Sequence, residues 1–394
     1  MKILILSNGK GEDSIAVTVL RAVQKTASSS SPITLTALPL VGDGHGYRAI
    51  GVEVVGARPL LPSGGFGHQG FRNLVEDIRA GLFGLIGHQL ATIRNENPDS
   101  ILAVGDMFPV ILGLLSKKPV IHIGTAFSLY LRKTFFFEDW LFRRCEKVFT
   151  RDAVTADYYQ KKGIRAEYVG NVMMDDPTIN ADGGTRSVLP CSDTGCRNLD
   201  SCACGNDTLS QDKKDPHIVI GLIPSSRMDA YDNLERLFEI CRHIPQRSLI
   251  SFSVSIAPNL EMERIQSIAS RFASELRIIL ETEPLISVIR KSTVAMGMTG
   301  TGNEQVVGLG CPLVLIQGRG PQSTKNRLIH YQRLLGESVS VPGGTDAVIG
   351  KQVGELLEQP ERLTQMGVIG RERMGLPGGA IKIARGILQK DDFY

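Results

Sequence analysis

The segment Val294-Ala-Met-Gly-Met-Thr-Gly-Thr-Gly-Asn-Glu304 carries the pattern on which the fold of this chain depends. Its first five residues are apolar or glycine and predict a short buried strand. Glycines and threonines follow at once, and the helical pattern begins near Gly302. A strand that passes into a helix through a glycine-rich turn is typical of α/β proteins, which place their ligand loops at such strand ends.

The same order of strand, loop and helix occurs along most of the chain. Expected strands cover residues 2–6, 33–39, 52–55, 100–104, 120–123, 148–150 and 166–169, then 217–223, 249–255, 277–280, 294–298 and 312–317. Expected helices cover 13–26 and 71–94, then 231–243, 259–272, 284–291 and 302–308, with further helices to the end. Strands that alternate with helices indicate βαβ units around mostly parallel sheets. We therefore predict an α/β chain of two Rossmann-like, doubly wound domains that face a central cleft.

The length of 394 residues is consistent with two domains, at roughly 100–200 residues per domain. Residues 176–216 are rich in Asp, Gly, Ser, Thr and Cys and lack apolar periodicity, which predicts a linker or insertion. The expected domains are therefore 1–175 and 217–365. Residues 366–394 are expected to form a C-terminal helix.

Composition excludes several classes of protein. The chain is 42% hydrophobic and 22% charged, which argues against disorder throughout. Its net charge of +3 comes without a long Lys/Arg block, so no nucleic-acid partner is expected. No run of about 20 apolar residues predicts a membrane span, and the N-terminus does not read as a signal peptide. We expect a cytoplasmic protein.

Three strand ends in the first half carry candidate acceptor-site residues. Gly9, Gly11, Glu12 and Asp13 follow the first strand, where glycines permit close backbone approach and a helix N-terminus favours an oxygen-rich ligand. The alternative is a tight turn with Asp13 as helix cap. Asp106 directly follows a buried strand. It is expected to act as a general base, and the alternative is a cap for the next helix. Gly124 and Thr125 end the next strand.

Loops of the second half favour a phosphate-bearing ligand. Small residues in Pro224-Ser225-Ser226-Arg227 allow backbone N–H groups and a guanidinium to converge on phosphate oxygens, the alternative being a surface arginine. Thr299, Gly300, Thr301, Gly302 and Asn303 open a helix whose free N–H groups suit an anion. Glu304 is expected to accept hydrogen bonds from ribose hydroxyls. The alternative is that its charge only interacts favourably with the helix dipole. Gln322 lies in a further glycine-rich loop, residues 318–322.

Four cysteines lie close together in the predicted linker: Cys191, Cys196, Cys202 and Cys204. Their spacing is not the paired C-x-x-C of common zinc sites, so free or oxidised thiols are the alternative to a metal cluster. Cys145, Cys241 and Cys311 are expected to be buried and inert. The histidines form no metal-binding motif, and His122 is expected to be a core residue.

Residues 129–144 interleave aromatic and basic side chains, among them Phe136, Trp140 and Arg132. This pattern suits a membrane interface with anionic headgroups. It equally suits an ordinary domain core with snorkelling cations. The sequence therefore allows two interpretations, contact with the inner face of a membrane, to which the apolar stripe at 71–86 would contribute, and a domain core.

Several of these motifs together resemble the lipid-A-disaccharide synthase family of GT-B glycosyltransferases, over nearly the whole chain outside the cysteine-bearing segment. The residues that carry the resemblance are Gly105-Asp106, Ile121-His122 with Gly124 to Arg132, Tyr168 to Asp175, Leu222 to Arg227, and Thr299 to Glu304. The segment Pro377-Gly378-Gly379-Ala380 fits a C-terminal helix that packs back on the first domain. Departures in the first loop, at Asn171 and at Ser225 make the chain more similar to the cyanobacterial-type, synthase-related branch.

The resemblance implies an inverting glycosyltransferase that uses a UDP-sugar and needs no metal or other cofactor. It implies that Ser225, Ser226, Arg227, residues 299–304 and Gln322 bind the nucleotide sugar. Asp106 would act on an acceptor hydroxyl and Arg227 on the departing diphosphate, while residues 9–13, Gly124, Thr125 and Arg132 bind the acceptor. The lipid A acceptor of that family does not carry over, so the expected acceptor is a hydroxyl of a lipid-like or other molecule. The alternatives are a UDP-N-acetylglucosamine 2-epimerase-like enzyme and a non-catalytic protein that binds nucleotide sugar or lipid.

Overall fold

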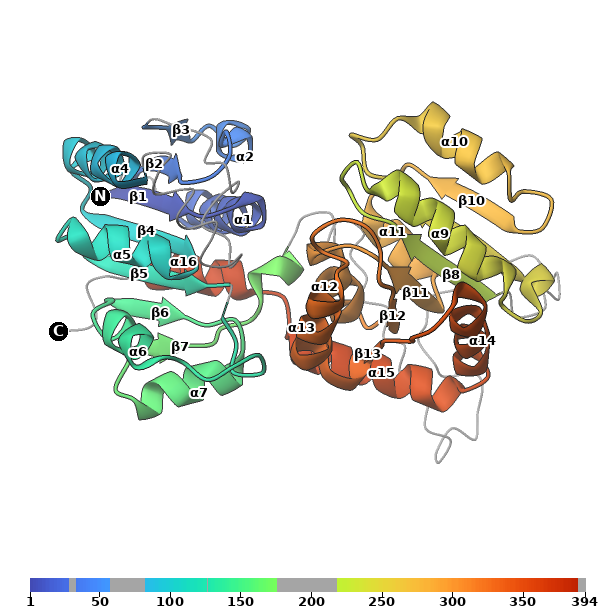
Figure 1. Cartoon of the computed structure of the whole chain (residues 1–394). Helices are drawn as coiled ribbons and strands as arrows, with labels where there is room; N and C mark the ends of the chain where they lie inside the picture. The colour runs from blue at the N-terminus through green and yellow to red at the C-terminus, as the bar shows by residue number, and fades with distance from the viewer. Residues whose placement is uncertain (28–32, 57–81, 126, 176–217, 389–394) are drawn as a thin grey trace, which may run out of the picture.

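The computed structural model of the chain describes residues 1–27, 33–56, 82–125, 127–175 and 218–388. These residues form two α/β domains that lie side by side, with the first in blue to green and the second in yellow to red (Figure 1). Each domain is built on one sheet, and all strand pairs among the described residues run parallel. The alternation of strand and helix in the sequence therefore correctly predicted the class of fold.

The sheet of the first domain has the strand order β3-β2-β1-β4-β5-β6-β7. Its strands are β1 (Lys2–Ser7), β2 (Thr34–Pro39), β3 (Glu53–Val54), β4 (Ser100–Gly105), β5 (Val120–Gly124), β6 (Lys147–Phe149) and β7 (Ala166–Glu167). The order reverses direction between β1 and β4, and a crevice opens at such a reversal because the helices on its two sides lie on opposite faces of the sheet.

The sheet of the second domain repeats this plan with the order β10-β9-β8-β11-β12-β13. Its strands are β8 (Ile218–Ile223), β9 (Ile250–Ser255), β10 (Arg277–Glu281), β11 (Val294–Gly297), β12 (Leu313–Leu315) and β13 (Val339–Ser340). Here the reversal lies between β8 and β11. The loops after these two strands contain the nucleotide-binding residues expected from the sequence, except Gln322, which follows β12.

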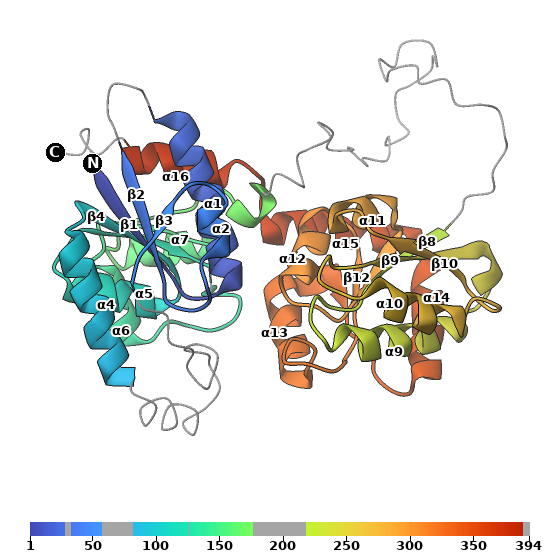
Figure 2. The same cartoon turned by 90° about the horizontal axis from the view of Figure 1, so that it is seen from above.

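Helices cover both faces of each sheet (Figure 1, Figure 2). In the first domain they are α1 (Lys10–Thr26), α2 (His45–Arg48), α4 (Leu82–Glu96), α5 (Met107–Leu115), α6 (Phe136–Phe142), α7 (Ala153–Lys161) and a 3-10 turn at Val172–Asp175. The later helices are α9 (Ala230–Arg242), α10 (Met262–Ser270), α11 (Leu285–Lys291), α12 (Thr301–Gly308), α13 (Lys325–Leu335), α14 (Asp346–Leu357), α15 (Pro360–Met374) and α16 (Gly379–Leu388), with 3-10 turns at Arg247–Leu249 and Gly336–Ser338.

The two-residue period of β1 explains how one strand serves both layers. Ile3 and Ile5 join the buried cluster formed with α1, α2 and α16, whereas Leu4 and Leu6 join the cluster on the opposite face. All four side chains are almost completely buried. At about 1.5–3 kcal/mol for each buried aliphatic side chain, this strand contributes strongly to the stability of both layers.

The C-terminal helix returns to the first domain, as predicted. Helix α16 packs against α1, and its residues Ala380, Ile383 and Ile387 belong to the core of the first domain (Figure 2). The chain thus crosses between the domains twice among the described residues. The carboxylate of Asp175 accepts hydrogen bonds from the backbone N–H groups of Gly378 and Ala380, which ties the two crossings together.

Several elements differ from their predicted bounds. Helix α1 begins at Lys10 rather than at residue 13, and α10 is shorter than the predicted 259–272. Strand β13 is short and was not predicted. Helix α4 ends near the predicted residue, but the first part of the predicted helix 71–94 lies outside the described residues. Cys191, Cys196, Cys202 and Cys204 also lie outside them.

Candidate functional site

The N-termini of α1 and α12 meet at the domain interface. A Cβ placed on Gly11 would lie 3.6 Å from Cγ2 of Thr301, at ordinary contact distance. Each helix begins at the strand-order reversal of its own sheet. Because the first N–H groups of a helix lack partners within the helix, two such ends facing each other favour an oxygen-rich or anionic ligand. The structure therefore brings together two loops that the sequence placed in opposite halves.

Two carboxylates, Glu12 and Asp106, mark the first-domain side of this interface. A Cβ placed on Gly105 would lie 3.0 Å from Cγ of Glu12, so Glu12 packs over the end of β4. Burial raises the pKa of Glu12, and the negative charges of Asp106, Asp13 and Glu304 raise it further, against the effect of a backbone hydrogen bond. A carboxylate with a raised pKa is a better proton acceptor, because basicity increases with pKa.

Asp106 is held firmly at the first turn of α5. One carboxylate oxygen accepts the backbone N–H of Phe108 at 2.8 Å, so Asp106 is the N-cap of this helix. The other accepts a hydrogen bond from Nδ2 of Asn8, also at 2.8 Å. The cap interpretation of the sequence is thus structurally correct, and Asn8 is a member of the site that the sequence did not single out.

Asp13 does not cap α1, because the helix begins three residues earlier, with Gly9 at its N-cap position. Its carboxylate instead accepts a 2.5 Å hydrogen bond from the hydroxyl of Ser7, and the buried hydroxyl of Tyr47 also donates to Ser7 at 2.7 Å. Burial raises the pKa of Asp13 to about 6, although the hydrogen bonds that its carboxylate accepts from Ser7 and, at 3.4 Å, from the Tyr47 hydroxyl lower it. Asp13 therefore anchors α1 to the end of β1.

On the second-domain side, three loops are held together by buried polar residues. Nδ2 of Asn233 donates to the carbonyls of Pro224 and Arg319, and its Oδ1 accepts the N–H of Arg319 at 2.7 Å. The hydroxyl of Ser323 donates to the carbonyl of Met298 at 2.6 Å. The loops after β8, β11 and β12 thus form one surface, as their positions at neighbouring strand ends predicted.

Within these loops, the predicted residues lie near one another. The side chain of Gln322 lies 3.4 Å from a Cβ placed on Gly300, and its Oε1 accepts hydrogen bonds from Arg327. Asn303 is buried and donates to the carbonyl of Thr299 at 2.6 Å. The side chain of Arg227 is exposed in the loop after β8.

Ser225 adopts a backbone conformation that ordinarily favours glycine, with φ of 141°. Its hydroxyl donates to Oδ1 of Asp229 at 2.9 Å and accepts the backbone N–H of Arg227 at 3.3 Å. These two bonds keep the loop in the shape that brings Arg227 to the strand end. A serine thus occupies a glycine-like turn at this position.

Arg151, which the sequence did not single out, forms an ion pair with Glu304 across the domain interface. Both side chains are largely buried, with 12% and 9% exposure. Arg151 also donates from Nη1 to the carbonyl of Thr125 at 3.1 Å. An arginine shortly after a strand end was the available signal, but its partner lies 153 residues away in the chain.

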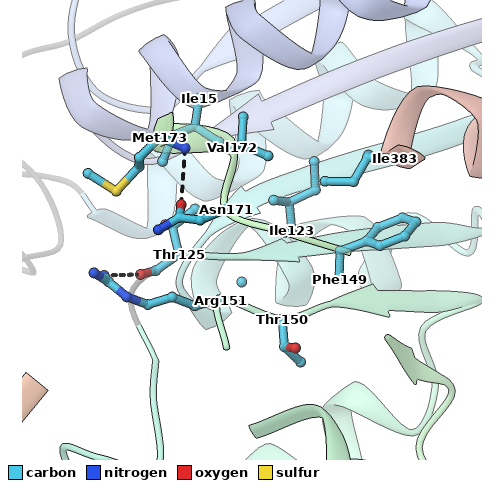
Figure 3. A pocket seen from close by; sticks show the side chains of 12 residues that line it. Ile15, Ile123, Thr125, Phe149, Thr150, Arg151, Asn171, Val172, Met173 and Ile383 are labelled. Carbon is cyan, nitrogen blue, oxygen red and sulfur yellow. Dashed lines mark hydrogen bonds between the residues drawn. The ribbon is translucent and has the colours of Figure 1, made fainter. Parts of the chain in front are cut away.

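A small pocket at the carboxyl ends of β5 and β6 adjoins this ion pair (Figure 3). Thr125, Arg151 and Asn171 form its polar side, while Ile123, Phe149 and Ile383 gather on the opposite side. The hydroxyl of Thr125 is buried and has no hydrogen-bond partner among the described residues. The space beside the predicted acceptor residues Gly124 and Thr125 is therefore mostly apolar, with one available hydroxyl.

Arg132 has a different environment from the one predicted. It forms a bidentate ion pair with Glu138 and stacks on Phe127 and Phe135, with its Cζ 4.9 and 4.8 Å from the ring centroids. Because Glu138 is buried, Arg132 organises the start of α6. In this structure its guanidinium is engaged there rather than at the paired helix N-termini.

His122, Cys145, Cys241 and Cys311 are buried, as predicted. A ring nitrogen of His122 lies 3.0 Å from the carbonyl of Ala103, and burial lowers its pKa to about 4, so the ring is neutral near pH 7. Burial raises the pKa of all three thiols. Within the described ranges, no three metal-ligating side chains gather, and no helix is long and apolar enough to cross a membrane.

No protein-family model and no curated protein sequence matches the chain. Among solved structures, the calicheamicin glycosyltransferase CalG4 is similar over 99% of both chains, with a TM-score of 0.61 and 13% identity. MurG from Acinetobacter baumannii matches over 98% of this chain and 99% of its own, with a TM-score of 0.60 and 13% identity. A UDP-GlcNAc 2-epimerase from Neisseria meningitidis, bound to UDP-GlcNAc, matches over 98% of this chain and 100% of its own. Its TM-score is 0.57 and its identity 14%.

These similarities show that the chain has the two-domain GT-B architecture, shared by glycosyltransferases and by epimerases. At this level of identity they show the fold alone. The resemblance to the lipid-A-disaccharide synthase-related family stays a prediction.

Proposed function

We propose that this chain is a glycosyltransferase that moves a sugar from a UDP-sugar to a hydroxyl group of an acceptor. The observation that carries the proposal is the meeting of the N-termini of α1 and α12, with Glu12 and Asp106 on one side and the phosphate-binding loops on the other. In this assignment residues 1–175 bind the acceptor and 217–365 bind the donor. Helix α16 completes the first domain, whereas α15 packs against the second domain, so the predicted C-terminal segment 366–394 does not belong to the first domain as a whole. Residues 176–216 act only as a linker.

The donor would lie against the loops after β8, β11 and β12. Ser225, Ser226 and Arg227 contact the diphosphate, and the N–H groups of residues 299–303 at the start of α12 add to its stabilisation. Glu304 binds ribose hydroxyls, and Gln322 lines the same loop surface. Cationic and backbone donors aimed at the departing diphosphate provide charge stabilisation without a cofactor in this scheme.

On the acceptor side, we assign proton removal to Glu12 and its positioning to Asp106. The pKa of Glu12 is raised by burial, whereas both oxygens of Asp106 accept short hydrogen bonds from Phe108 and Asn8. The acceptor hydroxyl then attacks the anomeric carbon opposite the bond to UDP, its proton passes to Glu12, and UDP leaves with the bonding electrons. Attack from the opposite face inverts the anomeric centre.

The acceptor is proposed to be lipid-like, because α6 and the residue before it present aromatic side chains to solvent. Phe136 is 85% exposed, and Phe135, Phe137 and Trp140 are 63%, 47% and 45% exposed. Lys133, Arg143 and Arg144 are exposed beside them, while Glu138 and Asp139 are buried. Exposed rings with a basic rim suit an anionic membrane surface, where they would hold the enzyme beside its acceptor.

An epimerase is the second candidate, because a UDP-GlcNAc 2-epimerase shares the fold over essentially the full length of both chains. The two reactions differ in their need for an acceptor. A transferase releases UDP from a UDP-sugar faster when a lipid acceptor is added. An epimerase converts the sugar without an acceptor, and a binding protein shows no turnover in either case.

The test is UDP release from a panel of UDP-sugars, with and without polyprenyl-phosphate and glycolipid acceptors, followed by product analysis. Acceptor-dependent release with an inverted glycoside supports the proposal, and epimer formation without acceptor contradicts it. Glu12→Gln is expected to lower kcat by about 10²–10⁴-fold and leave UDP affinity unchanged. Gln24→Ala, in the exposed last turn of the same helix, serves as its control.

A further inference from the structure

Arg151 and Glu304 connect the proposed acceptor domain to the proposed donor site. Arg151 follows β6 of the first domain, and Glu304 lies in the first turn of α12. Their ion pair is largely shielded from solvent. Separating such a pair costs free energy, because each charge would then be buried without a partner. In this structure the carboxylate that the donor would need therefore already has a partner.

The setting of Arg151 shows that it is held in place from the first domain. Its Nη1 donates to the carbonyl of Thr125, which follows β5, and its Nη2 donates to Glu304. If Glu304 turned to another partner, Arg151 would keep the bond to Thr125. The interaction can therefore break on the second-domain side without releasing the arginine from the first domain.

The ion pair also lies beside the segments that cross between the domains. Sδ of Met374, the last residue of α15, is 4.0 Å from Arg151. The carbonyl of Met374 accepts a 2.8 Å hydrogen bond from Nδ2 of Asn171, and the N–H of Asn171 bonds to the carbonyl of Leu376. A change at Arg151 thus acts where the relative position of the domains is determined.

From these contacts we propose that Arg151 occupies the position on Glu304 that the ribose hydroxyls of the donor nucleotide take. The inference rests on the proposed function, since it assumes a UDP-sugar at α12. Binding of the donor exchanges a charged partner from the first domain for the neutral hydroxyls of the ribose. Donor binding and the contact between domains therefore compete, and Arg151 weakens the affinity for the donor.

This competition predicts an unusual result for the removal of a buried cation. Arg151→Gln is expected to tighten UDP binding by about fivefold, measured by calorimetry, because the nucleotide no longer displaces the arginine. The same variant is expected to have a lower melting temperature, because it loses an interdomain ion pair. A purely structural arginine would lower the melting temperature without improving the affinity.

A double-mutant cycle separates this role from a general effect. Glu304→Gln alone weakens UDP binding, and in its background Arg151→Gln no longer improves it. Arg151→Lys, which retains the charge with fewer donors, is the matched control and is expected to lie between wild type and Arg151→Gln. It also serves as the second variant if Arg151→Gln does not fold.

A nucleotide without ribose hydroxyls provides an independent probe. The gain in affinity from Arg151→Gln is expected with UDP and absent with 2′,3′-dideoxy-UDP. Wild-type protein that binds UDP, together with variants that bind it equally or more weakly, overturns the assignment of Arg151. Wild-type protein that does not bind UDP overturns the proposed function instead, so the two failures are distinguishable.

Discussion

Asn8 and Asp106 join the two loops at the strand-order reversal of the first sheet, through a 2.8 Å hydrogen bond from Nδ2 to Oδ2. Asn8 follows β1 and Asp106 follows β4, and these strands are neighbours although 98 residues separate the two side chains. Because Asp106 also caps α5, a single carboxylate determines both the start of a helix and the position of the first loop.

Asp106→Ala is expected to reduce sugar transfer by about 100-fold or more, because it removes the group that positions the acceptor loop beside Glu12. It should also lower the free energy of unfolding by about 1 kcal/mol through loss of the cap. Steady-state kinetics and urea denaturation measure the two effects separately.

Asp152→Ala is the matched control for this change. Asp152 also caps a helix, α7, and accepts the N–H of Thr155 at 2.8 Å. Its variant should show a similar loss of stability with transfer activity retained. Full activity in the Asp106 variant, at native UDP affinity, would show that Asp106 does not position Glu12 for transfer.

Asp13 predicts a definite dependence of stability on pH. Its pKa is raised by burial to about 6 in the folded protein, against 3.8 for an ordinary aspartate carboxyl group, so the folded state binds the proton more tightly. The stabilisation from this group is complete below pH 3.8 and is lost as the pH rises through 6. Solvent limits its size to about 1 kcal/mol.

Asp13→Asn mimics the protonated form and should flatten the dependence on pH between 4 and 7. The measurement is the urea midpoint of wild type and variant across that range. Asp157→Asn, at an exposed position of α7, provides the comparison for a generic loss of one charge. Parallel curves for wild type and Asp13→Asn would contradict the assignment.

Ser225 combines an unfavourable backbone with two favourable side-chain hydrogen bonds. Ser225→Ala retains the positive φ and loses both bonds, so it should destabilise the protein by about 1–2 kcal/mol. Ser225→Gly relieves the backbone while losing the same bonds and should remain within about 0.5 kcal/mol of wild type. Ser226→Ala, in the exposed neighbouring position, is the control, and urea denaturation is the measurement.

Trp140 is the only tryptophan in the sequence and lies within the exposed aromatic surface of α6. Cζ of Arg144 lies 3.5 Å from the centroid of its ring. If this surface enters a bilayer, tryptophan emission should shift to shorter wavelength when phosphatidylglycerol vesicles are added, and much less with phosphatidylcholine vesicles.

Phe136→Ser should weaken vesicle binding about tenfold, since burial of a phenylalanine contributes about 1.5–3 kcal/mol. Val348→Ser, a change at an exposed apolar residue of α14 in the other domain, should have no effect. Equal binding by both variants would show that α6 does not contact the lipid.

The class of fold could be predicted from the sequence because its determinants are local. The two-residue period in β1 and the glycine-rich ends of β1 and β11 are each recognisable within a stretch of about ten residues. Strand β13 was missed because Val339–Ser340 is too short to show a period. Helix α1 was placed too late because Gly9 and Gly11 read as turn residues, although the helix begins between them.

The candidate site was predictable in its loops but not in its pairings. Residues 9–13, 106, 225–227 and 299–304 lie at strand ends, where the sequence placed them. The partners of Asp13, Arg132 and Glu304 depend on packing in three dimensions, so no local pattern identified Tyr47, Glu138 or Arg151.

The return of α16 has a consequence for synthesis on the ribosome. Ile383 and Ala384 belong to the core beside β1 and α1, so the domain that is translated first lacks part of its core until the last described helix has emerged. While the second domain is being translated, the nascent first domain lacks α16, and an apolar face of α1 stays uncovered. Truncation before residue 379 is therefore expected to damage the half of the molecule farthest from the cut in sequence.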